Sequence, residues 1–202
     1  MIVVVCHYIY SELMSTIRDR ALEAAVELLG TQGMRSLTHA RVDEQAGLPR
    51  GSTSNYFRTR AALVDGVVGW VAQHEMLDFD PGFDPATATF DDVIDAFCRL
   101  LEDQTGPSRT RTIARYVLFL EAASDPSLRA PLVENRHLFE QWTTGMLAQL
   151  GIADPATAAR TLMACTEGLI LHRITVDPDI ELRQPVASVV RAALAPPAAA
   201  SR

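Results

Sequence analysis

The stretch from Thr38 to Arg60 restricts the possible folds of this chain more than any other. Residues 38–46 (THARVDEQA) predict a short helix, and Gly47 then permits a sharp turn. Residues 47–60 (GLPRGSTSNYFRTR) predict a second short helix with a small, polar side, an aromatic end and flanking arginines. Ser, Thr and Asn suit base edges, whereas Tyr and Arg suit phosphates. The two segments therefore predict a helix-turn-helix that enters the major groove of DNA.

These residues also carry a resemblance to a known family. The run from Ser15 to Leu63 resembles the N-terminal domain of the TetR family of transcriptional repressors. The matching positions are a long first helix that ends near Gly33, then Thr38, Val42, Ala46-Gly47-Leu48, Gly51, Tyr56-Phe57, Arg60 and Leu63. Asp43 occupies a position where the family usually has Ala. Ser54 and Asn55 replace commoner aromatic and bulky residues, so the bases that are read do not carry over from the family.

The predicted DNA contacts divide into two kinds. Phosphate contacts are assigned to Thr38, Tyr56 and Arg60. Base contacts are assigned to the second short helix and the arginine before it, namely Arg50, Ser52, Thr53, Ser54 and Asn55. With His39 and Gly51, the predicted DNA-binding set is Thr38, His39, Arg50, Gly51, Ser52, Thr53, Ser54, Asn55, Tyr56 and Arg60.

The distribution of charge differs between the N-terminal part of the chain (residues 15–60, here called the head) and the rest (residues 61–202, here called the body). The formal net charge of -7 excludes a generally basic nucleic-acid coat. Residues 15–60, however, hold seven Arg against five acidic residues, whereas residues 61–202 hold 11 Arg against 19 acidic residues. We therefore expect the affinity for DNA to be confined to the head.

The two ends of the chain are expected to lie outside the folded domains. The first ten residues are apolar, but a bilayer span takes about 20 residues, and the features of a signal peptide are missing. Two interpretations stay open for residues 1–14: a loosely packed arm, or a start of translation at Met14. The predicted domains are this extension, a helix-turn-helix domain over 15–62, a helical regulatory and dimerisation domain over 63–195, and a disordered tail over 196–202. We expect a cytoplasmic location and no contact with a membrane.

Hydrophobic periodicity predicts an all-α fold of about nine helices without a strand. The first helix is expected over residues 16–31, and a long one over 60–77 with Thr59 as its N-cap. Pro, Gly and Asp breakers divide the rest into helices near residues 90–104, 109–123, 127–150, 155–176 and 183–195. Pro131 is expected to kink its helix or to move its start.

Two of these helices favour self-association. Residues 162–171 (LMACTEGLIL) are apolar almost all round. The last helix has a broad apolar stripe of Val186, Val189, Val190, Ala193 and Leu194. We predict a homodimer interface on both helices, with Val190 in it, and the resembled family likewise pairs its last two helices. Burial within one chain is the alternative. A dimer would double the base pairs that one short helix reads on a palindrome.

The body also contains candidate ligand-binding residues, mostly large and apolar with a few polar groups between them: Trp70, Phe97, Arg115, Phe119, Trp142, Met146, Met163 and Glu167. Such mixtures line small-molecule pockets. The alternative is that the aromatic and Met residues simply form the core. Arg115 and Glu167 need partners if they are buried, and they could pair with each other or lie at the surface.

Motifs of enzymes are missing from the sequence. It has no GxSxG, no GxGxxG after a strand, no Walker loop and no metal-ligand spacing of Cys or His, so neither a cofactor nor a metal is expected. We predict a one-component TetR-like regulator, a repressor that binds a palindromic operator as a dimer and is released by a small apolar ligand. An architectural DNA-binding protein without a ligand and an all-helical enzyme are the alternatives. The sequence identifies neither the effector nor the operator, and it does not distinguish a repressor of transcription from an activator.

Overall fold

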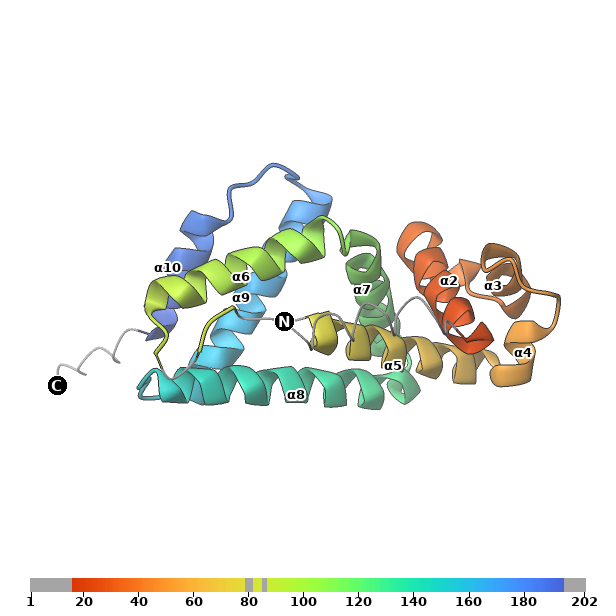
Figure 1. Cartoon of the computed structure of the whole chain (residues 1–202), viewed down its shortest axis with the longest axis horizontal. Helices are drawn as coiled ribbons and strands as arrows, with labels where there is room; N and C mark the ends of the chain where they lie inside the picture. Colours follow the sequence, from red (N-terminus) through yellow and green to blue (C-terminus); the bar gives the residue numbers. More distant parts are fainter. Residues whose placement is uncertain (1–15, 79–81, 85–86, 195–202) are drawn as a thin grey trace, which may run out of the picture. The chain divides into compact units, whose positions relative to one another are not determined.

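The computed structural model describes residues 16–78, 82–84 and 87–194, and this part of the chain is all-α (Figure 1). Its elements are α2 (Ile17–Gln32), the 3-10 turn η1 (Met34–Ser36), α3 (His39–Gln45), α4 (Ser52–Tyr56), α5 (Arg60–Asp78), α6 (Phe90–Thr105), α7 (Arg109–Ser124), α8 (Pro126–Gln149), α9 (Pro155–Thr175) and α10 (Arg183–Leu194). The predicted fold class is confirmed, and apart from α4 each helix end lies within one residue of its prediction. The predictions for residues 1–14 and for the tail at 196–202 lie outside the described residues.

The helices begin where local capping chemistry allows them to begin. At α2, the hydroxyl of Thr16 accepts the amide of Asp19 at 3.1 Å, and the carboxylate of Asp19 accepts the amide of Thr16 at 3.3 Å. Thr89 and Asp92 form the same reciprocal pair at α6. Thr59 accepts an amide from the first turn of α5, which confirms the predicted N-cap. Each pair satisfies amides that the first turn of a helix leaves without an intrahelical partner.

The chain divides into two compact units, and α5, α7 and α8 contribute residues to both. The first unit contains the described residues up to Gln73 together with Thr110–Leu132, and the second contains the remaining described residues. This division by contacts differs from the predicted functional boundary between residues 62 and 63, which stays a prediction. No helix within the described ranges is long and apolar enough to cross a membrane.

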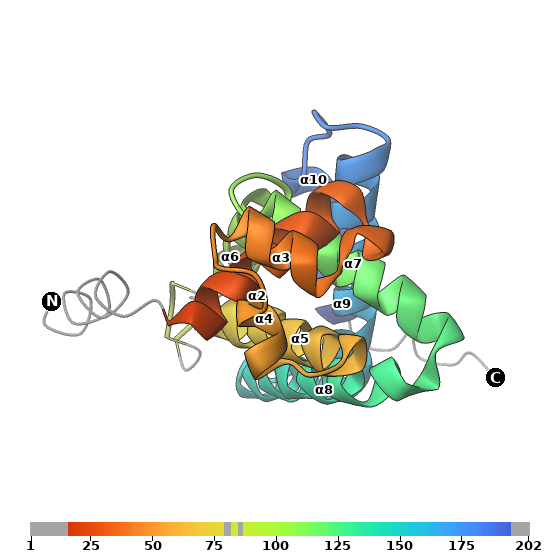
Figure 2. The same ribbon diagram turned by 90° about the vertical axis from the view of Figure 1, so that its right-hand side faces the viewer.

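The core of the first unit lies between α2, α3, α5 and α7 (Figures 1 and 2). Its largest fully buried side chains are Leu22, Leu28, Leu29, Leu37, Val42, Leu63, Val64 and Leu118. Two glycines set how closely the helices approach. A methyl group on Gly66 of α5 would lie 2.5 Å from the ring of Phe57, and one on Gly30 of α2 would overlap the backbone of Thr110. Tight contacts of this kind fix the position of α2 within its unit.

In the second unit, α10 packs against α6 and α9, and α6 packs against α9. The nearly fully buried apolar residues of these helices are Val93, Ile94, Phe97, Leu101, Leu162, Met163, Ile170, Val186 and Val190. An ion pair between Arg183 and Asp95 adds a polar link between α10 and α6.

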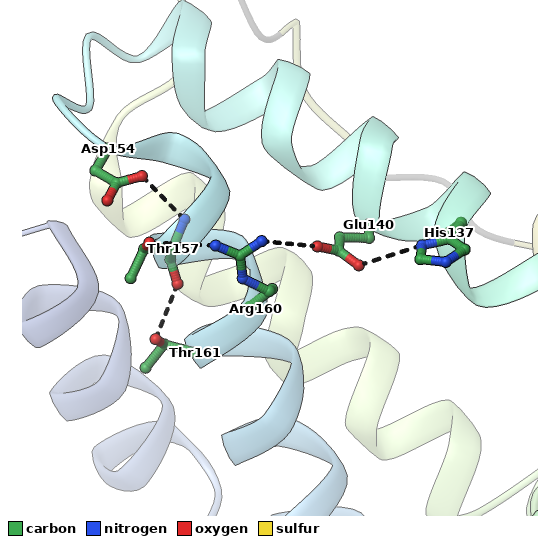
Figure 3. A network of polar contacts seen from close by, with 6 residues as sticks. All are labelled: His137, Glu140, Asp154, Thr157, Arg160 and Thr161. Carbon is green, nitrogen blue, oxygen red and sulfur yellow. Dashed lines mark hydrogen bonds and ion pairs between the residues drawn. The ribbon is translucent and has the colours of Figure 1, made fainter. Parts of the chain in front are cut away.

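Polar contacts also join α8 to α9 within the second unit (Figure 3). The carboxylate of Glu140 on α8 lies 3.7 Å from Arg160 of α9 and 3.7 Å from the ring of His137. Asp154 is the N-cap of α9 and accepts the amide of Thr157 at 3.1 Å. The hydroxyl of Thr157 in turn accepts a bond from Arg160 at 3.4 Å. The first turns of α9 are thereby joined to the middle of α8.

One prediction about the last helix is wrong. Val190 was expected in a dimer interface, but Val186 and Val190 are each 0% exposed within the single chain. They belong to the core that α10 forms with α6 and α9, so the alternative of burial within one chain holds for these two residues. Pro131 also does not move the start of its helix, since α8 begins at Pro126 and continues past residue 131; the kink at Pro131 stays a prediction. A helix start at Pro126 needs no amide from that residue.

Candidate nucleic-acid interface

The second helix of the predicted helix-turn-helix is α4, which contains only five residues. Gly47 (φ 61°) makes the predicted turn after α3, and Gly51 (φ 88°) is the N-cap of α4. Both conformations lie in the left-handed region, which glycine adopts without strain. No side chain of the N-cap residue bonds to the first turn of α4. The sequence therefore supplies the turn but not a local cap.

The outward side of α4 carries polar groups. Ser54, Asn55 and Tyr56 are exposed and Ser52 is half-buried. The hydroxyl of Ser54 donates to the carbonyl of Gly51 at 2.9 Å, which leaves its lone pairs free to accept. This side thus presents small hydroxyls, one carboxamide and one phenol, which are groups that read base edges and phosphates.

Thr53 does not belong to this outward side. It was predicted to face bases, but it is 0% exposed, and its hydroxyl donates to Oδ1 of Asp43 at 2.5 Å. The amide of Thr53 donates to the same oxygen at 2.8 Å, and the amide of Gly51 donates to Oδ2 at 2.7 Å. We therefore remove Thr53 from the predicted base contacts. The sequence shows that Asp43 replaces the Ala that is usual in the resembled family, but it does not show that Thr53 is the partner of this carboxylate.

Asp43 is buried, at 3% exposure, and its environment favours the carboxylate. Burial alone raises its pKa, whereas the hydrogen bonds from Thr53 and Gly51 lower it, with a smaller contribution from His39. The result is a pKa below the ordinary value for Asp. A buried carboxylate that accepts several backbone and hydroxyl hydrogen bonds behaves in this way.

Two residues at the start of α3 also have structural partners. Thr38 is the N-cap of α3, and its hydroxyl accepts the amide of Arg41 at 3.4 Å, although the residue is exposed. His39 is half-buried, and its Nε2 lies 2.6 Å from the carbonyl oxygen of Phe57, directly after α4. A carbonyl oxygen only accepts, so Nε2 carries the proton. Thr38 stays a candidate phosphate contact, whereas the bonded ring nitrogen of His39 faces the protein.

The arginines of the head lie at its surface. Arg50, Arg58 and Arg60 are all exposed. One nitrogen of Arg60 donates to the carbonyl of Met34 at 3.2 Å, which ties the start of α5 to η1. A guanidinium has five N–H groups, so this bond leaves donors for a phosphate. Arg20 donates to the carbonyl of Ala46 at 2.7 Å and thereby joins α2 to the turn.

The predicted ligand-binding residues are divided between the two units. Trp70, Arg115 and Phe119 belong to the first unit. Trp70 and Phe119 are partly buried and pack against its core. The guanidinium of Arg115, also partly buried, lies 5.1 Å from the centre of the ring of Tyr116.

The other five, Phe97, Trp142, Met146, Met163 and Glu167, belong to the second unit. Phe97, Met146 and Met163 are 2–4% exposed, as core residues are. Trp142 is half-buried and stacks on Phe139 with ring centres 6.0 Å apart. Of the two charged candidates, Glu167 forms an ion pair with Arg136. The assignment of these residues to a ligand site stays a prediction.

Comparison with protein families finds two adjacent matches. Residues 21–67 match the family described as "Bacterial regulatory proteins, tetR family". Residues 88–196, more than half of the chain, match "Tetracyclin repressor-like, C-terminal domain". The first match covers α3 and α4, which form the helix-turn-helix described above. No curated protein sequence matches the chain significantly.

Solved structures show the same fold over most of the chain. The multidrug binding protein EbrR, in complex with imidazole, is similar with 26% identity and a TM-score of 0.65, over 90% of this chain and 91% of that one. EbrR in complex with proflavin is similar with 25% identity and a TM-score of 0.58, over 88% and 99%. A TetR-family member from Streptomyces coelicolor A3 has 25% identity and a TM-score of 0.68, over 89% and 98%.

Proposed function

Because this chain belongs to the TetR family of bacterial regulatory proteins, we propose that it is a repressor that binds a palindromic operator as a homodimer and is released by a small, largely apolar ligand. The family and its structural neighbours are regulators and not enzymes, so the chain is a transcriptional regulator and the enzyme alternative is set aside. As a regulator of bacterial DNA, it would act in the cytoplasm.

The observation that carries the DNA-binding part of this proposal is the outward side of α4. Ser52, Ser54, Asn55 and Tyr56 lie on it, and exposed arginines precede and follow the helix at Arg50 and Arg58. Small polar groups between cations suit a helix in the major groove, because the cations neutralise phosphates while the small groups approach base edges. Arg60 and Thr38 are the proposed flanking phosphate contacts.

The homodimer is supported by the outer face of α9. Leu162, Met163 and Ile170 fill the core, whereas Ala164, Gly168 and Leu171 are exposed, and Leu171 is 47% exposed. Small residues beside a large apolar one let a second helix approach closely, which is how helices pack in tight interfaces. We assign this face of α9, and not the buried stripe of α10, to the contact with a second copy. The dimer doubles the number of bases read.

The ligand part is supported by the relatives and by composition. EbrR, at 25–26% identity, has been solved in complex with imidazole and with proflavin. The candidate residue Trp142 of the second unit is only partly buried, so it offers aromatic surface to a ligand. The ligand can release DNA only by binding the DNA-incompetent arrangement better than the competent one. A coupling of about 1–3 kcal/mol gives a change of about 5- to 150-fold in operator affinity.

The DNA-binding proposal is tested with the purified full chain and a library of randomised duplexes. Selection should recover a palindrome, and log K should fall linearly with log[salt]. Recovery of bound DNA without any shared sequence would favour the architectural alternative. Absence of binding at low salt would contradict the proposal.

The ligand proposal is tested with proflavin as the probe. It should stabilise the protein in a thermal shift assay and weaken operator binding, and the operator should weaken proflavin binding by the same factor. Proflavin also binds DNA directly, so Trp142→Ala is the control. An equal loss of operator binding in the variant would show that the dye acts on DNA alone. Stabilisation without any change in operator affinity would leave the body as a dimerisation scaffold.

A further inference from the structure

We propose that Asp43 and His39, one helical turn apart on α3, are positioning residues that cap the two ends of α4 and hold its outward side in the orientation that reads DNA. The functional half of this inference rests on the proposed DNA binding. Its structural half concerns the chain alone and is tested separately below.

Asp43 takes the place of an N-cap that α4 lacks. The N-cap residue is Gly51, which has no side chain to bond to the first turn. The carboxylate of Asp43 accepts the amides of Gly51 and Thr53 at 2.7 and 2.8 Å. An ordinary cap is a neighbour in sequence, but here the acceptor comes from the preceding helix, eight residues before Gly51. A carboxylate at this end also complements the positive end of the helix dipole.

His39 acts at the other end. Phe57 is the C-cap residue of α4, and its carbonyl accepts a hydrogen bond from Nε2 of His39 at 2.6 Å. Carbonyls at the end of a helix have no intrahelical partner, so this bond satisfies one of them. Both the neutral Nε2–H tautomer and the imidazolium can donate it.

Because of their spacing, His39 and Asp43 lie on a single face of α3, and this face caps both ends of α4. Residues four apart lie on the same side of a helix, so His39 and Asp43 face α4 together. A helix of five residues is too short to be stable alone. α4 therefore depends on its neighbours for its existence as well as for its position.

The contact with Thr53 fixes the rotation of α4 about its own axis. Successive residues of a helix are turned by about 100°. When the hydroxyl of Thr53 is held inward by Asp43, Asn55 and Tyr56 are turned toward solvent. Apolar packing would tolerate some rotation, whereas three directed hydrogen bonds to one carboxylate do not.

The test compares Asp43→Asn with Glu44→Gln, which removes the same charge from the exposed neighbouring position. Operator affinity and amide hydrogen exchange are measured for the full-length chain. Asp43→Asn should weaken operator binding at least about tenfold, which corresponds to about 1.4 kcal/mol, and should speed the exchange of the amides of Gly51 and Thr53. Glu44→Gln should change affinity by no more than about twofold. Asp43→Asn with wild-type affinity and wild-type amide protection would overturn the proposal.

Further variants keep the test decisive if Asp43→Asn does not fold. Thr53→Val removes one of the three bonds and should speed the exchange of the Thr53 amide, whereas Thr53→Ser keeps the hydroxyl and should restore protection. His39→Gln can still donate to Phe57 and should retain more operator affinity than His39→Leu. Equal behaviour within each pair would contradict the capping roles. If the wild-type chain bound no DNA, the proposed function would fail, while the exchange data would still decide the capping.

Discussion

Replacement of Gly30 by Ala combines a gain in helix propensity with a steric clash, and these two effects on stability have opposite signs. Gly30 is helical, in the last turns of α2, and the added methyl group would overlap the carbonyl oxygen of Thr110. It would also lie 2.6 Å from Cγ2 and 2.9 Å from the carbonyl carbon of Thr110, at the start of α7. Carbon–oxygen contacts are ordinarily about 3.3 Å or longer. Because the contacted atoms are mostly backbone, α2 or α7 must move by several tenths of an ångström or more.

The relative sizes of these two effects decide whether Gly30→Ala stabilises or destabilises the protein. Gly→Ala inside a helix stabilises by about 0.8–1 kcal/mol, whereas forcing an extra carbon into a packed contact costs about 1–3 kcal/mol. We expect the contact to dominate, so that Gly30→Ala lowers the free energy of unfolding by about 1 kcal/mol. Gly69→Ala in α5 is the matched control, since a methyl group there has no neighbour within 4 Å. The control should stabilise by up to about 1 kcal/mol.

Thermal unfolding at one fixed protein concentration measures both variants, because the concentration would otherwise shift the Tm of a dimer. For a chain of this size, about 1 kcal/mol corresponds to about 2–4 °C. Gly30→Ala should melt below the wild type and Gly69→Ala above it. If Gly30→Ala raised the Tm as much as Gly69→Ala, the close approach of α2 and α7 would not constrain the unit, and the reasoning would be refuted.

Three further predictions follow from the geometry. Asn55→Ala should relax the preference at particular base positions, worth about 1–3 kcal/mol, whereas Arg60→Ala should weaken all sequences alike and reduce the salt slope by about 1; titrations at several salt concentrations distinguish the two. Leu171→Glu should weaken the dimer in analytical ultracentrifugation and leave the helical circular dichroism unchanged, whereas Val190→Glu should unfold the second unit; a dimer unaffected by Leu171→Glu would exclude this face of α9. The pKa of Asp43 is lowered in the folded chain, so its contribution to stability is complete above the unfolded pKa of about 3.9 and is lost as the pH falls through the folded pKa. The free energy of unfolding of the wild-type protein should therefore fall more than that of Asp43→Asn below about pH 4. Parallel losses in the two proteins would contradict the role of the carboxylate.

Most of the fold could be predicted because the residues that start and stop a helix lie close in sequence to its ends. Thr59 caps α5, and Asp154 with Pro155 begins α9, in sequence patterns that need no knowledge of distant residues. The turn at Gly47 was predictable for the same reason, since its positive φ favours glycine. Such signals depend on neighbours within four residues, so one sequence is sufficient.

The inward or outward direction of individual side chains was harder to predict. Thr53 and Asn55 are both small, polar residues of one short helix, yet one is fully buried and the other exposed. Only the position of Asp43 on another helix separates them, and that contact spans ten residues. Val190 was misassigned for a similar reason. An apolar stripe indicates that a helix face is covered, but the partner that covers it depends on the tertiary fold.

The inward and outward sides of α4 have a consequence for how target preference can change. The anchoring groups are Thr53 and Phe57, whereas the groups proposed to face DNA include Ser52, Asn55 and Tyr56. Substitutions in the second set remove none of the bonds that hold the helix. Gene duplicates can therefore diverge toward new promoters by a few surface changes without an intermediate that fails to fold. A laboratory library restricted to these three positions should yield altered specificities on an unaltered scaffold.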